Sequence, residues 1–418
     1  MQLRHFYPLA SRVLRTVALL LVLSATPPAS SEDLIGLYLS WQNDPTTTMT
    51  LNWVDPYADS SDTVWYRPYE SKEWATASAE QSNVGPMTLQ LRRVELKKLK
   101  PGTLYEFGIG EKTDDVSHFW RFRTMPATLE RPITFVEGGD MMHTRKMLDA
   151  MSRNMQKLDP DFAMLIGDLA YEDGVNGTHW IDWLQSWRKF SVAKGKRLIP
   201  MVVGIGNHEV KGHYNGKIPE DAPYYYSLFS QPGLRSYYAL DFGDYLSLVI
   251  LDSAHTQPVA GPQAEWLKTA LAERDDQQFL FAGYHFPAYG TDKAPKDGTP
   301  LDAPLSVEMR KHWIPHFERH GASIIFEHDH HNFKRTHRIR NEKRDDANGL
   351  LYLGDGAWGV KTRTVPPDAW WLAKAEARNH LWHGELRKDG TATFKAIDVE
   401  GEVFDEVELT TSRTKPVP

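Results

Sequence analysis

Phe326-Glu327-His328-Asp329-His330-His331-Asn332-Phe333-Lys334-Arg335 is the stretch around which the rest of this chain is organised. It follows a short apolar run, residues 322–326, that is typical of a buried strand. In extended chain, side chains alternate between faces, so His328 and His330 would point the same way. Imidazole is the most common metal-binding side chain, so the pair can share one ion or hold two neighbouring ions. Alone, the stretch is equally consistent with a solvated polar turn.

Four other segments repeat this arrangement, in which an apolar strand ends in a side chain that can bind a metal. The strand candidates are residues 133–136, 162–166, 197–205 and 279–283. The polar side chains that follow them are Asp140, Asp168 with Tyr171, Asn207 with His208, and His285. Because ligands of α/β sheets bind beyond the carboxyl ends of the strands, we expect these side chains to converge with His328 and His330.

Two kinds of periodicity divide the chain. Residues 34–126 carry short alternating runs between turn-rich pieces, which predicts a β sandwich with Trp53 in its core and Tyr105 tying a crossing loop. Residues 130–412 alternate strands with helical patterns, which predicts an α/β domain. The helical patterns cover residues 147–158, 179–190, 262–274 and 307–319. We interpret the strands after residue 350 as a meander that completes a second sheet.

The amino-acid composition limits which kinds of metal site and binding partner are possible. The 418 residues contain no cysteine, so any metal must be held by His, Asp, Glu, Asn or Tyr. The formal net charge of -7 offers no basic field to nucleic acid. Residues 1–31 combine arginines, a short apolar run and small residues, as in a secretory signal, and we expect export to the periplasm or the exterior. The apolar run is too short for stable membrane insertion; an uncleaved anchor or a disordered leader is the alternative.

The expected cluster has oxygen and imidazole donors and one phenol. Asp168 is the candidate to bridge two ions, because its segment lies between the others. A phenolate at Tyr171 favours a hard trivalent ion, so we infer Fe(III) beside a divalent Zn, Mn or Fe ion. Two such ions can clamp a phosphorus centre and lower the pKa of a bound water. His208 is left to protonate a leaving alcohol or to hold a phosphate oxygen.

These segments resemble the five blocks of the calcineurin-like metallophosphoesterases. The blocks are Gly139-Asp140, Gly167-Asp168-Leu169-Ala170-Tyr171, Gly206-Asn207-His208-Glu209, Tyr284-His285 and His328-Asp329-His330. With Tyr171 three residues after the second aspartate, the chain resembles the purple acid phosphatase group in particular. That group also carries a fibronectin type III-like domain in front of its catalytic domain. The resemblance implies a four-layer α/β/β/α catalytic domain. It also implies hydrolysis of phosphate monoesters by metal-bound hydroxide, with His208 assisting the leaving group.

Position by position, the resemblance implies two ligand sets that share one carboxylate. The ferric set is Asp140, Asp168, Tyr171 and His330. The divalent set is Asp168, Asn207, His285 and His328. His143 and His331 lie nearby in the sequence, and we interpret both as solvated or supporting residues. The chain departs from the family pattern where Glu327 replaces a glycine.

Two other functions remain open at this point. The first is a phosphodiesterase or nucleotidase that uses the same metal site. The second is a non-catalytic surface module in which the sandwich binds a partner. The expected partner of the enzyme is a small phosphorylated substrate, and the sequence leaves the natural substrate and the oligomeric state open.

Overall fold

The computed structural model describes residues 34–56, 61–111, 119–291, 303–365 and 369–411. The expected secretory signal at residues 1–31 therefore lies outside the described residues. Within the described part of the chain, none of the helices has the length and apolarity that crossing a membrane requires.

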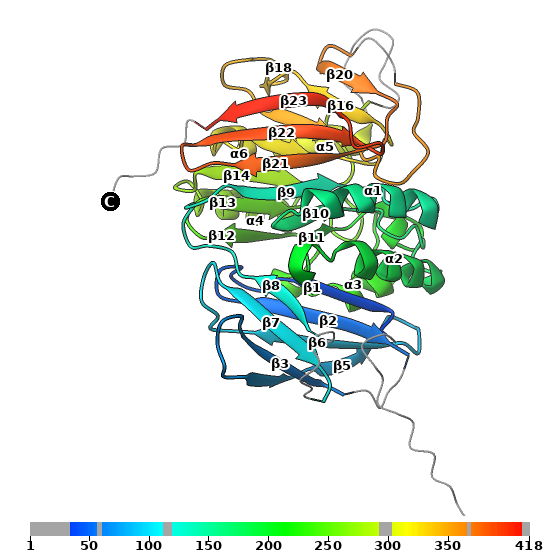
Figure 1. The fold of residues 1–418 in the computed structure, drawn as a ribbon. Helices are drawn as coiled ribbons and strands as arrows, with labels where there is room; N and C mark the ends of the chain where they lie inside the picture. The colour runs from blue at the N-terminus through cyan, green and yellow to red at the C-terminus, as the bar shows by residue number, and fades with distance from the viewer. Residues whose placement is uncertain (1–33, 57–60, 112–118, 292–302, 366–368, 412–418) are drawn as a thin grey trace, which may run out of the picture.

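An all-β sandwich forms the N-terminal end of the molecule and lies at the bottom of Figure 1. One sheet has the order β1 (Gly36–Ser40), β2 (Met49–Asp55), β6 (Gln90–Leu96), β5 (Glu80–Asn83). The other has the order β4 (Ala75–Ser78), β3 (Thr63–Pro68), β7 (Leu104–Ile109), β8 (Trp120–Arg123). Trp53 is fully buried between the sheets. The Tyr105 hydroxyl accepts a hydrogen bond from the Lys100 N–H at 2.9 Å, so Tyr105 ties its loop as the sequence predicts.

The remainder of the chain builds two large sheets. The first has the order β11 (Met201–Gly204), β10 (Phe162–Ile166), β9 (Ile133–Gly138), β21 (His380–Leu386), β22 (Thr391–Asp398), β23 (Val403–Thr410). The second has the order β12 (Tyr238–Phe242), β13 (Leu246–Ile250), β14 (Phe279–Gly283), β15 (Ile324–Phe326), β19 (Leu351–Gly354), β16 (Phe333–Thr336), β20 (Leu372–Glu376). A separate pair is formed by β17 (Ile339–Arg340) and β18 (Lys343–Arg344).

Phenylalanines hold the two large sheets face to face. The Phe135 ring of β9 lies 6.3 Å from Phe281 of β14 and 6.4 Å from Phe326 of β15. Phe394 of β22 lies 5.6 Å from Phe281. Strands buried on both faces read as continuous apolar runs, which is why residues 162–166 and 279–283 carry few polar side chains.

Helices cover the outer face of each large sheet. The helices are α1 (Arg145–Leu158), α2 (Gly177–Phe190), α3 (Pro223–Leu228), α4 (Pro262–Ala272), α5 (Pro304–His312) and α6 (Ile314–Arg319). Leu148 and Met151 of α1 pack in one cluster with Leu165 of β10, whereas Leu267 of α4 packs with Leu280 of β14. The resulting α/β/β/α layering behind an all-β sandwich confirms the predicted fold class.

Two details differ from the prediction. The helical pattern at 307–319 forms two helices. Pro315 lies in the first turn of α6 and has no backbone N–H group, so it cannot make the hydrogen bond that one continuous helix would need there. The late strands do not form one meander in a second sheet. β19 pairs with β15, whereas β21 to β23 extend the first sheet from β9 and lie beside it in Figure 1. Local alternation does not specify which existing strand an added strand pairs with.

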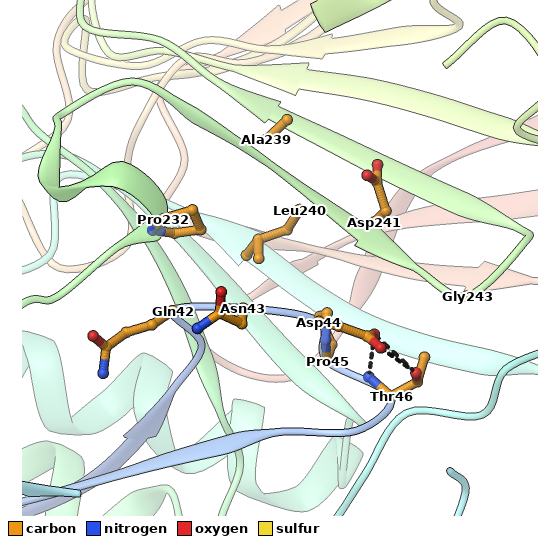
Figure 2. A pocket seen from close by; sticks show the side chains of 10 residues that line it. All are labelled: Gln42, Asn43, Asp44, Pro45, Thr46, Pro232, Ala239, Leu240, Asp241 and Gly243. Atoms are coloured by element: carbon orange, nitrogen blue, oxygen red, sulfur yellow. Dashed lines mark hydrogen bonds between the residues drawn. The ribbon is translucent and has the colours of Figure 1, made fainter. Parts of the chain in front are cut away.

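The sandwich packs directly on the α/β domain. Trp41 contacts Phe162 and Phe242 edge-on, at centroid distances of 6.3 and 5.5 Å. Arg93 of β6 donates to the carbonyl of Leu228 at 2.6 Å. Beside these contacts the junction opens into a cavity of about 390 Å³, shown in Figure 2, between residues 42–46 and the β12–β13 hairpin. None of the predicted site residues lines this cavity.

Candidate metal centre

The loops after β9, β10 and β14 bring three of the predicted ligands together. Oxygen or nitrogen atoms of Asp140, Asp168 and His285 all lie within 4.8 Å of one another, and all three side chains are buried. The Nε2 atom of His285 is 3.3 Å from Asp168 Oδ1 and 3.2 Å from the Asn207 side-chain oxygen. Side chains separated by more than a hundred positions in the sequence therefore share one small volume.

Glycines permit this close approach of the loops. A Cβ atom at Gly206 would come within 2.4 Å of Asp168 Oδ1, and one at Gly356 within 1.7 Å of Asp140 Oδ2. Gly356 also has a φ of +71°, a backbone conformation that residues other than glycine adopt only at a cost in free energy. The backbone at both positions therefore leaves room for the carboxylates and for nothing bulkier.

Tyr171 joins the same cluster. Its hydroxyl donates to Asp140 Oδ1 at 3.0 Å and lies 3.0 Å from His331 Nε2. Burial, together with the charges of Asp140 and Asp168, raises the pKa of Tyr171 well above its ordinary value. In the absence of a cation the phenol would thus keep its proton, and a strongly charged ion is needed to hold it as phenolate.

His328 and His330 lie beside this cluster, with the His328 ring stacked on His285 at 6.2 Å, but their ring nitrogens face other carboxylates. The His328 ring is buried against a carboxylate of β9, with Nε2 2.9 Å from Glu137 Oε1. The Nδ1 atom of His330 lies 3.3 Å from Asp355 Oδ2 and accepts the N–H of Thr291 at 3.0 Å, while its Nε2 atom lies 3.6 Å from Asp329 Oδ2. The ligand roles predicted for both histidines are therefore not supported by their positions.

Their neighbours take these places. His331 Nε2 lies 3.0 Å from Asp140 Oδ1. Asp329 Oδ1 lies 3.9 Å from His285 Nε2, and the Asp329 N–H donates to Asp140 Oδ2 at 3.0 Å. Asp329 is not among the ligands predicted from the sequence, and His331 is predicted there to be a solvated or supporting residue. Asp329 and His331 have the same spacing of two residues as His328 and His330.

The shift of one residue has a backbone cause. Asp329 and His331 have φ angles of 73° and 58°, in the left-handed region. The prediction assumed extended chain, in which alternate side chains share a face, and left-handed residues break that alternation. Asp140, Asp168 and Tyr171 are also left-handed, with φ between 52° and 54°. Backbone strain of this kind gathers at functional sites, where the surrounding structure maintains it.

Glu209 braces the cluster from behind. Its carboxylate accepts the N–H groups of Asp168, Leu169 and Gly206 at 2.7 to 2.8 Å. Burial, and then the charge of Asp168, raise the pKa of Glu209 to about 7. The Gly-Asn-His-Glu sequence thus supplies both a donor to the cluster, at Asn207, and the carboxylate that fixes the neighbouring loop.

His208 lies at the open side of the cluster. Its Nδ1 atom is 2.5 Å from Asp173 Oδ1, and its Nε2 atom is 3.9 Å from Asp168 Oδ2. The ring stacks on Tyr171 at 4.4 Å and meets His213 at 5.3 Å. Burial lowers the pKa of His208, but Asp168 and Asp173 outweigh it and raise the value above the ordinary one. Asp173 therefore favours a ring that carries a proton.

The donor set fits a pair of cations. Asp140, Asp168 and Asp329 gather three carboxylates in a largely buried volume, where uncompensated charge is costly. Asp168 Oδ2 is buried and makes no hydrogen bond to any described residue. Oxygen and imidazole donors without sulfur suit iron, zinc or manganese. Cations between these groups would offset the negative charge of the carboxylates and would coordinate the Asp168 Oδ2 atom.

Two family models match the chain in the order of its two domains. Residues 35–124 match the purple acid phosphatase N-terminal domain, and residues 139–332 match the calcineurin-like phosphoesterase family. The chain is a purple acid phosphatase-like member of the calcineurin-like metallophosphoesterases. This family uses a dinuclear metal centre, and the cluster around Asp168 lies inside the matched range.

Curated relatives carry the same family name. The chain is 25% identical over 294 residues to purple acid phosphatase 15 of Arabidopsis thaliana, covering 64% of this chain and 53% of that protein. It is 24% identical over 299 residues to a purple acid phosphatase of Glycine max, covering 65% and 61%. The matched region thus spans between half and two thirds of these relatives.

A solved relative shares the fold of this purple acid phosphatase-like chain. The structure of the purple acid phosphatase PPD1 from yellow lupin seeds matches with a TM-score of 0.74 at 16% identity. The match covers 90% of this chain and 74% of the lupin chain, so it extends over the sandwich as well as the α/β domain.

Proposed function

We propose that this protein is a metal-dependent phosphohydrolase that cleaves phosphate monoesters. The observation that carries the proposal is the convergence of Asp140, Asp168 and His285 in one buried cluster, inside the region that matches the phosphoesterase family. His208 at the open side of the cluster supplies a proton donor where a substrate would enter.

The proposed ligands form two sets around Asp168. The first set is Asp140, Asp168, Tyr171 and His331, and it suits Fe(III) because a phenolate prefers a hard trivalent ion. The second set is Asp168, Asn207, His285 and Asp329, for a divalent Zn, Mn or Fe ion. Contacts of His331 with Asp140 and of Asp329 with His285 support this assignment in place of the one based on His328 and His330.

A pair of cations held there would polarise the phosphoryl oxygens and lower the pKa of a water molecule. The residues of the chain do the remaining work. Asp173 orients the His208 ring through Nδ1, which leaves Nε2 facing the cluster. From that position Nε2 can donate its proton to the oxygen of the departing alcohol. Export, expected from residues 1–31, stays a prediction.

Metal analysis combined with a visible spectrum tests the proposal. We expect two metal ions per protein, one of them iron, and a phenolate-to-Fe(III) absorption band that disappears in Tyr171→Phe. Turnover of p-nitrophenyl phosphate should exceed turnover of bis(p-nitrophenyl) phosphate. A colourless, iron-free but active protein would contradict the ferric site, and a preference for the diester would favour a phosphodiesterase. A metal-loaded protein that hydrolyses neither ester would support a non-catalytic role.

Replacing Asp173 by asparagine should separate the two roles considered for His208. If His208 protonates the leaving group, Asp173→Asn should lower kcat about tenfold more for glycerol phosphate than for p-nitrophenyl phosphate, because nitrophenolate leaves without a proton. His208→Gln should show the same bias with a larger loss. Equal losses on both substrates would indicate that His208 instead holds a phosphate oxygen.

A further inference from the structure

Apolar side chains are exposed beside the candidate metal centre. Six large hydrophobic side chains are exposed among the described residues, and three of them, Val175, Tyr214 and Ile218, belong to two loops next to His208. These loops touch, because a Cβ atom at Gly174 would come within 2.3 Å of the Lys211 nitrogen. Exposed apolar groups gathered at the rim of a polar site indicate a ligand with an apolar part.

The loop that carries Tyr214 is held at several points. The Asn215 N–H donates to the Ala254 carbonyl at 3.0 Å, and the His213 N–H donates to the Val210 carbonyl at 2.9 Å. Tyr214 lies between these two anchored residues, with 42% of its surface exposed. The backbone therefore presents the ring in a fixed place, which reduces the entropy that binding to it would cost.

Ring contacts connect Tyr214 to the metal centre. Its ring meets Phe286 edge-on, at 5.1 Å and an interplanar angle of 83°. Phe286 in turn lies 5.7 Å from the His285 ring, and its N–H is held by the Ser253 hydroxyl at 2.8 Å. On the other side, His213 lies 5.3 Å from His208. Tyr214 thus stands on the His208 side of the cluster, one ring further out than Phe286.

The order of these ring contacts, from His285 through Phe286 to Tyr214, favours a leaving group that extends beyond the ring nearest the cluster. An aryl ring bonded directly to the ester oxygen would lie beside His208 and His285. A planar ring set apart from that oxygen by a sugar would extend one ring further out, to Tyr214. The edge-on contact with Phe286 occupies no more than one face of the Tyr214 ring. A nucleobase can stack on the other face, and such stacking tolerates any of the bases.

The chain continues from Tyr214 into a cavity. Residues 215–217 line it together with Thr256 and Gln257, and its volume is about 330 Å³. That volume falls at the lower end of the range for small-ligand sites, about 300 to 1,000 Å³. The side-chain amides of Asn215 and Gln257 in its wall can pair with the polar edge of a base whose face lies on Tyr214.

We propose that Tyr214, supported by Phe286, binds the base of a nucleoside monophosphate while the phosphate occupies the candidate metal centre. This inference rests on the proposed phosphomonoesterase function and names its substrate class. Tyr214 acts as a specificity-determining residue, because it touches a part of the substrate that does not react.

Two substrates that differ only in the base test the inference. The ratio of kcat/KM for AMP to that for ribose 5-phosphate is measured in the natural protein and in Tyr214→Ala. The natural protein should prefer AMP, and the variant's ratio should fall about tenfold, within the range for removing one base–aromatic stack. Tyr214→Phe should keep the natural ratio, since it retains the ring. Tyr69→Ala is the matched control, because Tyr69 is 43% exposed but lies in the sandwich.

The outcomes separate this inference from the proposed function. Equal kcat/KM values for AMP and ribose 5-phosphate, or a ratio unchanged by Tyr214→Ala, would overturn the role of Tyr214 while the phosphatase remains. If AMP, ribose 5-phosphate and p-nitrophenyl phosphate are all left intact, the proposed function fails. Calorimetric titration with the same two compounds then tests the base contact directly. Tighter binding of AMP that is lost in Tyr214→Ala would support the contact, and equal binding would overturn it.

Discussion

Replacing His331 by alanine is expected to remove one metal ion per protein and to lower kcat for p-nitrophenyl phosphate by more than about a hundredfold. The reason is the position of its Nε2 atom, 3.0 Å from both Asp140 Oδ1 and the Tyr171 hydroxyl. Among the candidate ligands His331 supplies the imidazole on this side of the cluster. Metal content by elemental analysis, read together with turnover, measures the effect.

His330→Ala is the matched control, because it removes the same side chain one position away. His330 bonds to Thr291 and faces Asp355, so its loss should leave metal content at the natural level. Asp329→Ala should reduce the content of the divalent ion, since Asp329 faces His285. If His330→Ala lost a metal while His331→Ala kept both, the ligand set first expected from the sequence would be right, and the proposed one wrong.

Replacing Lys334 by methionine is expected to lower the free energy of unfolding by about 3 to 5 kcal/mol. Lys334 is fully buried, with its Nζ atom 2.6 Å from Glu327 Oε2 and 3.3 Å from Asp355 Oδ1. Methionine fills the space but leaves two buried carboxylates without their cation. Urea titration followed by tryptophan fluorescence measures the loss, with exposed Lys146→Met as a control expected to change little.

A double variant and a pH series sharpen this prediction. Lys334→Met with Glu327→Gln should recover part of the loss, because one of the unpaired charges is gone. Burial raises the pKa of Asp355, but Lys334 and His330 outweigh it and hold the value below the ordinary one. In the natural protein this contribution is therefore present above about pH 4 and lost as the pH falls further. In Lys334→Met the pKa of Asp355 should be raised, so stability should increase on acidification towards pH 5. A parallel fall in both proteins would contradict the role of Lys334.

The contacts of Glu327 in the folded structure explain why a carboxylate stands at this position. The sequence marked it only as a residue in place of the family's glycine. In the structure it accepts the Tyr284 hydroxyl at 2.8 Å and the Ala288 N–H at 2.7 Å, besides pairing with Lys334. The buried Glu327 carboxylate is thus matched by a buried lysine seven residues later, whereas His328 is the residue that precedes the first proposed ligand, Asp329. Two residues that pair only after folding cannot be recognised as partners from their positions in the sequence.

The sequence by itself was sufficient for the order of sandwich and α/β domain and for the Tyr105 tie, because periodic burial and turn chemistry depend on neighbouring residues. The four-layer arrangement of the α/β domain was implied by the family resemblance. The sequence also placed five potential donors, from Asp140 to His285, at the ends of apolar runs. Only the tertiary structure decided that Asp329 and His331, rather than His328 and His330, face the cluster. It likewise decided that β21 to β23 extend the first sheet. The reason is common to both cases: left-handed backbone turns and strand partners depend on contacts between distant segments, and these leave no periodic signal along the chain.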